Sequence, residues 1–206
     1  MKKISVCVLG LGYIGLPTAV LLASRGYHVC GVDLNKHIVE KINQGESHIS
    51  EPDLEKLLHR TVNNGSFKAV TKPEKSNVYI ICVPTPCHYD EEIPRADTSF
   101  IFNAINSILT LLKNEDLLIL ESTAPVGTTK KISNLLKKIN LNTSKVHIGY
   151  SPERVLPGKI IKELTENNRI VGGITRKATS LIAEFYKSFV DGKILETDSK
   201  TAELCK

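Results

Sequence analysis

Residues 4–33 have the sequence ISVCVLGLGYIGLPTAVLLASRGYHVCGVD. The first six residues form an apolar run of strand composition, and a turn with glycines at 10, 12 and 15 follows it. A helical stretch over 16–25 comes next, and then a second apolar run over 29–32 that ends at Asp33. This order of strand, glycine-rich turn, helix and strand predicts one continuous βαβ unit.

The three glycines match the pattern G-x-G-x-x-G, which is weak evidence alone because glycines are common. Its place between a strand and a helix, with Asp33 lying 18 residues beyond Gly15, makes it the pattern of a dinucleotide-binding turn. Gly10 permits the tight turn, Gly12 lets the backbone approach a pyrophosphate, and Gly15 lets the helix lie close to the strand. The helix N-terminus offers N–H groups to the phosphates. A glycine-rich turn without a ligand is the alternative.

Asp33 indicates which dinucleotide to expect. A carboxylate at the end of the second strand can accept hydrogen bonds from both hydroxyls of the adenosine ribose, and it would repel a 2′-phosphate. The next residues are Leu34, Asn35 and Lys36, with no arginine where enzymes that use NADP usually need one. NAD is therefore the expected cofactor, and Lys36 is interpreted as a solvated lysine at a helix start.

Length and composition are those of an ordinary globular protein. The chain has 206 residues, of which 41% are hydrophobic and 24% charged, enough for one large domain or one and a half. The net charge of +5 is mild and the lysines are scattered, so no nucleic-acid partner is expected. No apolar stretch approaches the ~20 residues that span a bilayer, and no signal peptide is recognisable, so no membrane association is expected.

The cysteines give no sign of a metal site or a disulfide framework. Their spacing forms no CxxC pair and no cluster with histidine, so no metal is expected and a reducing cytoplasm is favoured. The first three lie in apolar runs and are interpreted as buried. The five positions are Cys7, Cys30, Cys82, Cys87 and Cys205.

Strands and helices alternate along the rest of the chain. Strands are expected at 67–70, 77–83, 116–120, 146–149, 170–171 and 193–195. Helices are expected at 35–43, at 53–62 with Asp53 as N-cap, at 98–112, 127–138 and 176–189, and from about 198 onward. This alternation predicts an α/β fold with a Rossmann-like, doubly wound parallel sheet and helices on both faces.

Ligands of such sheets bind beyond the carboxyl ends of the strands. The unusual residues fall at those ends, so we expect Thr85, Thr123, Glu153 and Arg154 to converge on one cleft there. The strand-end segments are the Gly10 turn, Asp33, Pro84–Thr85–Pro86, Glu121–Ser122–Thr123 and Ser151–Pro152–Glu153–Arg154.

These segments, taken in order, resemble the UDP-glucose/GDP-mannose dehydrogenase family. The matching motifs are GLGYIG at 10–15, VPTP at 83–86, STAPVGT at 122–128 and SPERVLPG at 151–158. The last motif, with the stretches 45–53 and 163–173, is most similar to the UDP-N-acetyl-D-mannosamine dehydrogenase branch. The resemblance implies a full-length enzyme that oxidises the C6 alcohol of UDP-N-acetyl-D-mannosamine to the uronic acid with two NAD, through a cysteine thioester.

The resemblance also assigns roles on the cofactor side. Tyr13 and Ile14 correspond to the backbone positions over the pyrophosphate. Thr85 and Thr123 resemble the threonines beside the nicotinamide and the reacting C6, with Thr123 counted among both the cofactor-binding and the catalytic residues. A threonine after a strand is as often a helix cap, so capping is the alternative role.

On the substrate side, Glu153 resembles the glutamate that assists proton transfer through water. Arg154 and Val155 resemble substrate-contacting positions, and a guanidinium suits a diphosphate or a sugar carboxylate. A surface ion pair is the alternative for Arg154. Pro157 stands where the UDP-glucose enzymes have a second glutamate, so that part of their hydrolysis scheme is not transferred.

Lys206 resembles the lysine of the long central helix, which binds substrate and stabilises the developing alkoxide. At the chain end it is expected to be frayed and exposed. Cys205 is not interpreted as the nucleophile, because the family's thiol belongs to a Gly-Gly-His-Cys-type motif that these residues do not contain.

The expected organisation is an NAD-binding domain at 1–197 and the start of the central linking helix at 198–206, with the UDP-sugar domain lying further on. The whole enzyme is expected to be a cytoplasmic homodimer or higher oligomer, and the chain alone a monomer without activity. The same-class alternatives are UDP-glucose, UDP-N-acetylglucosamine or GDP-mannose as substrate. A module that binds NAD without catalysis is the alternative of another class. A 3-hydroxyacyl or 6-phosphogluconate-type dehydrogenase would leave the segment 151–158 unexplained.

Overall fold

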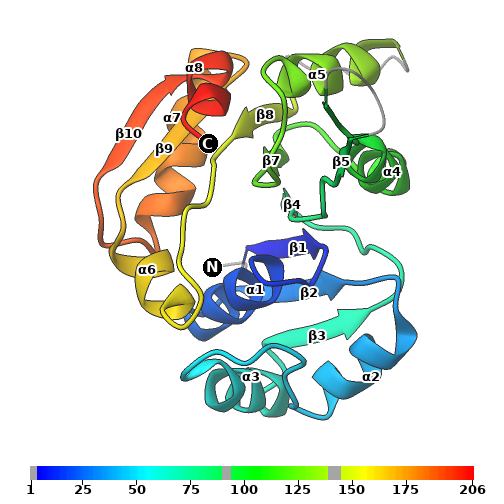
Figure 1. Ribbon diagram of the computed structural model, residues 1–206, viewed down its shortest axis with the longest axis vertical. Coiled ribbons are helices and arrows are strands. Elements are labelled where there is room, and N and C mark those ends of the chain that lie inside the picture. The colour runs from blue at the N-terminus through cyan, green and yellow to red at the C-terminus, as the bar shows by residue number, and fades with distance from the viewer. Residues whose placement is uncertain (1–3, 90–93, 139–144) are drawn as a thin grey trace.

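The computed structural model describes residues 4–89, 94–138 and 145–206 (Figure 1). Within those residues, one eight-stranded sheet has the strand order β10-β9-β8-β7-β4-β1-β2-β3. This architecture confirms the expected Rossmann-like α/β fold. The strands are β1 Ser5–Leu9, β2 His28–Val32, β3 Phe67–Val70, β4 Val78–Ile81, β7 Leu117–Leu120, β8 His147–Tyr150, β9 Arg169–Gly173 and β10 Ile194–Asp198.

Helices cover both faces of the sheet, as expected. Alternate residues of β1 enter different cores: Val6 and Val8 pack with α1, α3, α6 and α7, whereas Cys7 and Leu9 pack with α4 and α5. Both faces of the central strands are therefore apolar, as is typical of a buried parallel sheet. The helices are α1 Gly15–Ser24, α2 Lys36–Asn43, α3 Leu54–Asn63, α4 Ser99–Ile108, α5 Thr128–Lys138, α6 Ile160–Glu166, α7 Arg176–Lys187 and α8 Ser199–Leu204.

The expectation of a fully parallel sheet is wrong at one edge. β9 pairs with β8 in the antiparallel sense, and β10 follows the direction of β9. Helix α6 has seven residues, which is roughly 10 Å of helix and too short to return the chain to the amino ends of the strands. The chain therefore enters β9 from the carboxyl edge of the parallel strands, and the first residue of β9, Arg169, lies at that edge.

Three local expectations also need correction. Asp53 does precede α3, but its backbone is left-handed, with φ of 63°, and its side chain makes no capping hydrogen bond. The expected polar loop between Val83 and the helix at 98 contains a small hairpin of β5 Cys87–His88 and β6 Arg95–Ala96. Helix α6 was not expected at all, since its seven residues are too few to show a helical period.

The last helix, α8, is fixed at both ends. The Asp198 side chain accepts hydrogen bonds from the backbone N–H groups of Lys200 (2.9 Å) and Thr201 (3.2 Å). The buried carboxylate of Glu203 accepts from the N–H groups of Gly127 (2.5 Å) and Thr129 (2.7 Å) and from the Thr129 hydroxyl (2.6 Å). Glu203 therefore caps the N-terminus of α5 from another part of the chain and attaches α8 to α5.

None of the helices in the described parts of the chain has the length and apolar character to cross a bilayer.

The Glu203 cap makes the first testable prediction. Glu203→Gln should lower the free energy of unfolding by about 1–3 kcal/mol, because an amide has a single acceptor oxygen for donors that are buried at the α5 N-terminus. Urea unfolding followed by circular dichroism measures it. Glu166→Gln is the matched control, since Glu166 is exposed and its ion pair with Lys162 lies at the surface. Equal stabilities of the two variants would contradict the capping role.

Candidate functional site

A pocket of about 450 Å³ lies at the carboxyl ends of β1, β4 and β7. Its wall combines the glycine turn, the end of β2, the segments after β4 and β7, and the last residue of the chain. The structure thus brings together eight of the residues that the sequence predicted for cofactor binding or catalysis. These are Gly10, Gly12, Tyr13, Ile14, Asp33, Thr85, Thr123 and Lys206.

The glycine turn has the geometry that the motif predicts. Gly10 has φ of +93°, and a Cβ there would lie 2.5 Å from the Cys82 carbonyl oxygen. A Cβ on Gly15 would lie 1.8 Å from the Gly10 carbonyl oxygen, so α1 approaches β1 too closely for any side chain. At Gly12 a Cβ would meet no atom within 4 Å in the part of the chain that the structure describes. Gly10 and Gly15 therefore shape the turn, while Gly12 faces open space where a ligand can approach the backbone.

Asp33 is held at the end of β2 by two backbone donors. Its Oδ2 accepts from the Leu11 N–H (3.3 Å) and its Oδ1 from the Asn35 N–H (2.9 Å). Each carboxylate oxygen has two lone pairs, so both can still accept a further hydrogen bond from the pocket. No side chain of the described residues caps the α1 N-terminus, where Ile14 occupies the N-cap position. The two features fit a dinucleotide, with ribose hydroxyls at Asp33 and phosphates at the start of α1.

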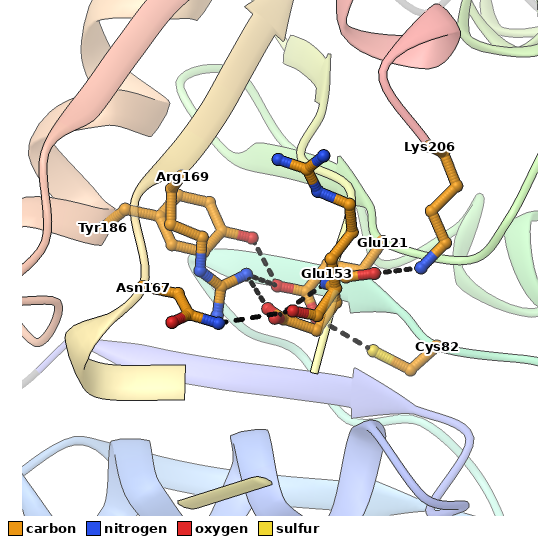
Figure 2. A network of polar contacts seen from close by, with 8 residues as sticks. Cys82, Glu121, Glu153, Asn167, Arg169, Tyr186 and Lys206 are labelled. Atoms are coloured by element: carbon orange, nitrogen blue, oxygen red, sulfur yellow. Dashed lines mark hydrogen bonds and ion pairs between the residues drawn. The ribbon is translucent and has the colours of Figure 1, made fainter. Parts of the chain in front are cut away.

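A cluster of buried charges adjoins this pocket (Figure 2). Arg169 contacts the carboxylates of Glu153 and Glu121, and its Nη1 lies 3.5 Å from Glu121 Oε1. Tyr186 donates its hydroxyl to the same Glu121 oxygen at 2.5 Å, and the Arg169 guanidinium carbon lies 5.0 Å from the centre of the Tyr186 ring. All four residues are at most 2% exposed. Such burial is tolerated because every charge faces an opposite one.

Glu153 joins this cluster to the pocket. Its Oε1 accepts from the Arg154 N–H (2.9 Å), and its backbone carbonyl accepts from Lys206 Nζ. Burial raises the pKa of Glu153, and Glu121 adds to the effect while Arg169 opposes it. Partial burial lowers the pKa of Lys206, which Glu153 and Glu121 oppose. The pKa of the carboxyl group is thus raised and that of the ammonium lowered, so both are shifted in the direction of neutral pH, which suits these groups to proton transfer.

The expected single cleft is divided in two. Thr85 and Thr123 line the first pocket, whereas Glu153 and Arg154 line a neighbouring cavity of about 350 Å³. The β9 reversal places Arg169 at this edge, where it lines the second cavity and contacts Glu121 of the first. Val155 is half-buried and packs against a hydrophobic core, so its side chain supports the segment. Lys206 is exposed as expected, but its ammonium is directed at the Glu153 carbonyl rather than frayed.

Several residues of the site had no predicted role. Glu121 lies in the strand-end segment 121–123 and Arg169 in the motif stretch 163–173. The sequence did indicate a special role, because each is a single charged residue next to a short apolar strand. Tyr186 gave no signal, because it continues the apolar face of a helix. Cys82 was expected to be buried, but it is half-buried in the pocket wall, where its Sγ donates to Glu121 Oε2 (3.3 Å). Among the described residues, no group of His, Cys, Asp and Glu side chains could hold a metal ion.

Comparison with known proteins agrees with this geometry. The model of the NAD-binding domain of the UDP-glucose/GDP-mannose dehydrogenase family matches residues 4–190. A UDP-N-acetyl-D-mannosamine dehydrogenase of Methanococcus vannielii is 48% identical over 100% of this chain and 47% of its own length. One from Campylobacter jejuni is 47% identical over 98% of this chain and 51% of its own. The chain therefore spans about half the length of the curated relatives it matches.

Solved structures give the same result. The UDP-N-acetyl-mannosamine dehydrogenase of Staphylococcus aureus superposes with a TM-score of 0.93 at 39% identity, covering 98% of this chain and 49% of that one. A GDP-mannose dehydrogenase from Pseudomonas aeruginosa has a TM-score of 0.86 at 26% identity, covering 98% and 48%. With a family match over 4–190 and the predicted glycine turn in place, this chain belongs to the UDP-glucose/GDP-mannose dehydrogenase family and contains its NAD-binding domain.

Proposed function

We propose that this chain provides the NAD-binding domain and one side of the active site of a nucleotide-sugar 6-dehydrogenase. The substrate we propose is UDP-N-acetyl-D-mannosamine, which is oxidised at C6 to the uronic acid with two NAD. The observation that carries the proposal is the joint placement of Lys206 and Thr123 in one pocket with the glycine turn. Relatives with that activity in their names, at 47–48% identity, support the choice of sugar.

The cofactor would lie along the carboxyl edge of the sheet. The turn from Gly10 to Gly15, with the backbone of Tyr13 and Ile14, would hold the pyrophosphate, and Asp33 would accept from the adenosine ribose. Thr85 and Thr123 would lie beside the nicotinamide. The chemistry that NAD supplies when bound is acceptance of a hydride from C6.

The chain's own groups would manage charge and protons around C6. The Lys206 ammonium would stabilise the oxygen that becomes an alkoxide, as a cation in a partly dry site can. Its lowered pKa favours giving and taking a proton there. Glu153 would assist proton transfer through water, with Thr123 orienting that water. Arg154 would border the nucleotide sugar from the neighbouring cavity, and Val155, whose side chain packs against the core, would contact it through its backbone.

One sibling activity has an observation in its favour. An NDP-N-acetyl-D-galactosaminuronic acid dehydrogenase of Ralstonia nicotianae is 45% identical over 98% of this chain. An epimeric N-acetylhexosamine is therefore the second candidate substrate. UDP-glucose is less favoured as a substrate, because Pro157 stands where the UDP-glucose enzymes have a second glutamate.

The organisation of the whole enzyme stays a prediction. We propose that residues 1–197 form the cofactor domain and that α8 begins a central helix leading to a UDP-sugar domain. The attachment of α8 to α5 through Glu203 supports a defined starting point for such a helix. A homodimer or higher oligomer and a cytoplasmic location, the latter favoured by five free cysteines, complete the proposal.

The cofactor assignment predicts a preference at Asp33. The chain should bind NAD, and NADP at least about tenfold more weakly, because the carboxylate would face the 2′-phosphate. Asp33→Ala should weaken NAD binding and reduce the difference in affinity between NAD and NADP. Titration calorimetry with both cofactors measures this. Asp191→Ala, at an exposed aspartate outside the pocket, is the control. Equal affinities of the unmodified chain for NAD and NADP would contradict the role of Asp33.

The catalytic assignment predicts that the 206-residue chain alone does not sustain turnover. Oxidation in two steps needs a reactive thiol over C6, whereas burial raises the pKa of Cys82 well above its usual range and keeps that thiol protonated. Much of the remote binding energy for the sugar would also be missing. NADH absorbance with UDP-N-acetylmannosamine, UDP-N-acetylglucosamine and UDP-glucose tests it. Sustained NADH formation by the purified chain would refute the prediction, and activity only in a chain as long as its relatives would support it.

A further inference from the structure

Arg169 lies between two carboxylates that come from different strand ends, Glu121 after β7 and Glu153 after β8 (Figure 2). We propose that Arg169 is a positioning residue, which fixes the Glu153 carboxyl against Glu121 and sets its protonation beside Lys206. The inference rests on the proposed role of Glu153. The proposal assigns the second carboxylate of the site to Glu121, which follows the neighbouring strand β7. It does not look for that carboxylate in the segment 154–158, which follows Glu153.

The strand reversal creates this arrangement. Gly149 pairs with Gly173 and Tyr150 with Gly172 across β8 and β9. Continuing this antiparallel register beyond Tyr150 brings residue 153 opposite residue 169, which is where their ion pair forms. A parallel β9 would place its first residue at the other edge of the sheet. The contact between Arg169 and Glu153 is therefore built into the topology.

Arg169 is held so that it cannot relax into water. Its guanidinium lies over the Tyr186 ring, and Tyr186 in turn donates its hydroxyl to Glu121. The Cys82 thiol donates to the second Glu121 oxygen. Glu121 is thereby fixed by two neutral donors and one cation, while Glu153 has the cation and the Arg154 N–H. Glu121 is therefore the more firmly anchored of the two carboxylates.

The charges in this cluster do not cancel. One guanidinium faces two carboxylates, and the other charges acting on Glu153 are Lys206 beyond α8 and its neighbour Arg154. Tyr186 and Cys82 both donate to Glu121, and Cys82 also interacts electrostatically with Glu153. Losing the Arg169 charge would destabilise the Glu153 carboxylate, whereas losing the Glu121 charge would stabilise it. A side chain that only filled space would produce neither effect, and replacing a buried ion pair by apolar residues is often neutral or stabilising.

The test is a pH titration of the Glu153 carboxyl in the 206-residue chain by carbon-13 NMR, with the resonance assigned through Glu153→Gln. Arg169→Gln should raise the midpoint of Glu153 by at least about one pH unit, and Glu121→Gln should lower it. Arg169→Lys, which keeps the positive charge, should raise the Glu153 midpoint less than Arg169→Gln does. Lys177→Gln, which removes an exposed cation paired with Glu115, should leave it unchanged.

The proposal is overturned if the Glu153 midpoint is unchanged in both Arg169→Gln and Glu121→Gln, or if it moves in the same direction in both. Should Arg169→Gln fail to fold, the unmodified chain provides a second measurement: the Arg169 Nε–H resonance should shift with the same midpoint as Glu153. Independent midpoints would likewise overturn the proposal. The titration needs no NAD turnover, so a wrong assignment of the enzyme's function would leave its outcome unaffected and the two failures stay distinguishable.

Discussion

The structure depends on one backbone contact, in which β1, α1 and β4 meet without side chains between them. A Cβ on Gly15 would overlap the Gly10 carbonyl oxygen, and one on Gly10 would overlap the Cys82 carbonyl oxygen. This contact lets α1 start directly at the edge of the sheet, with its N-terminus over the pocket. Fold and cofactor site therefore have the same cause, which is the lack of side chains at the three glycines. At Gly10 and Gly15 it lets the βαβ unit pack closely, and at Gly12 it leaves the backbone accessible to a ligand.

The second constraint is the direction of β9. In a doubly wound sheet every strand end supplies one segment to the ligand edge, and a parallel β9 would deliver its last residue there. The reversed strand delivers its first residue instead, and that residue is Arg169. Two buried carboxylates then have a common cation. Removing one partner of a buried ion pair typically costs about 3–5 kcal/mol, so each of the three charges contributes to the stability of this edge of the sheet.

Sequence patterns predicted the parts of this molecule that local chemistry determines. The glycine turn, Asp33 and the central strands depend on nearby residues, and they were placed correctly. The direction of β9 depends on pairing with a strand some twenty residues earlier, and no hydrophobic period reports strand direction. The Glu203 cap and the Arg169 cluster join positions 74 to 76 and 48 residues apart. Such contacts exist only after the sheet is assembled, so single-sequence reasoning gave those residues no role.

Buried carboxylates, in addition to apolar contacts, connect the pieces that surround the pocket. Glu203 ties α8 to the start of α5, and the segment that carries Thr123 leads directly into α5. Glu153 receives Lys206 through its carbonyl and Arg169 through its carboxylate. Hydrogen bonds and ion pairs have defined directions, whereas apolar packing tolerates small slides. The positions of Lys206, Thr123 and Glu153 relative to one another are consequently specified by the fold of this chain itself, before any ligand contributes.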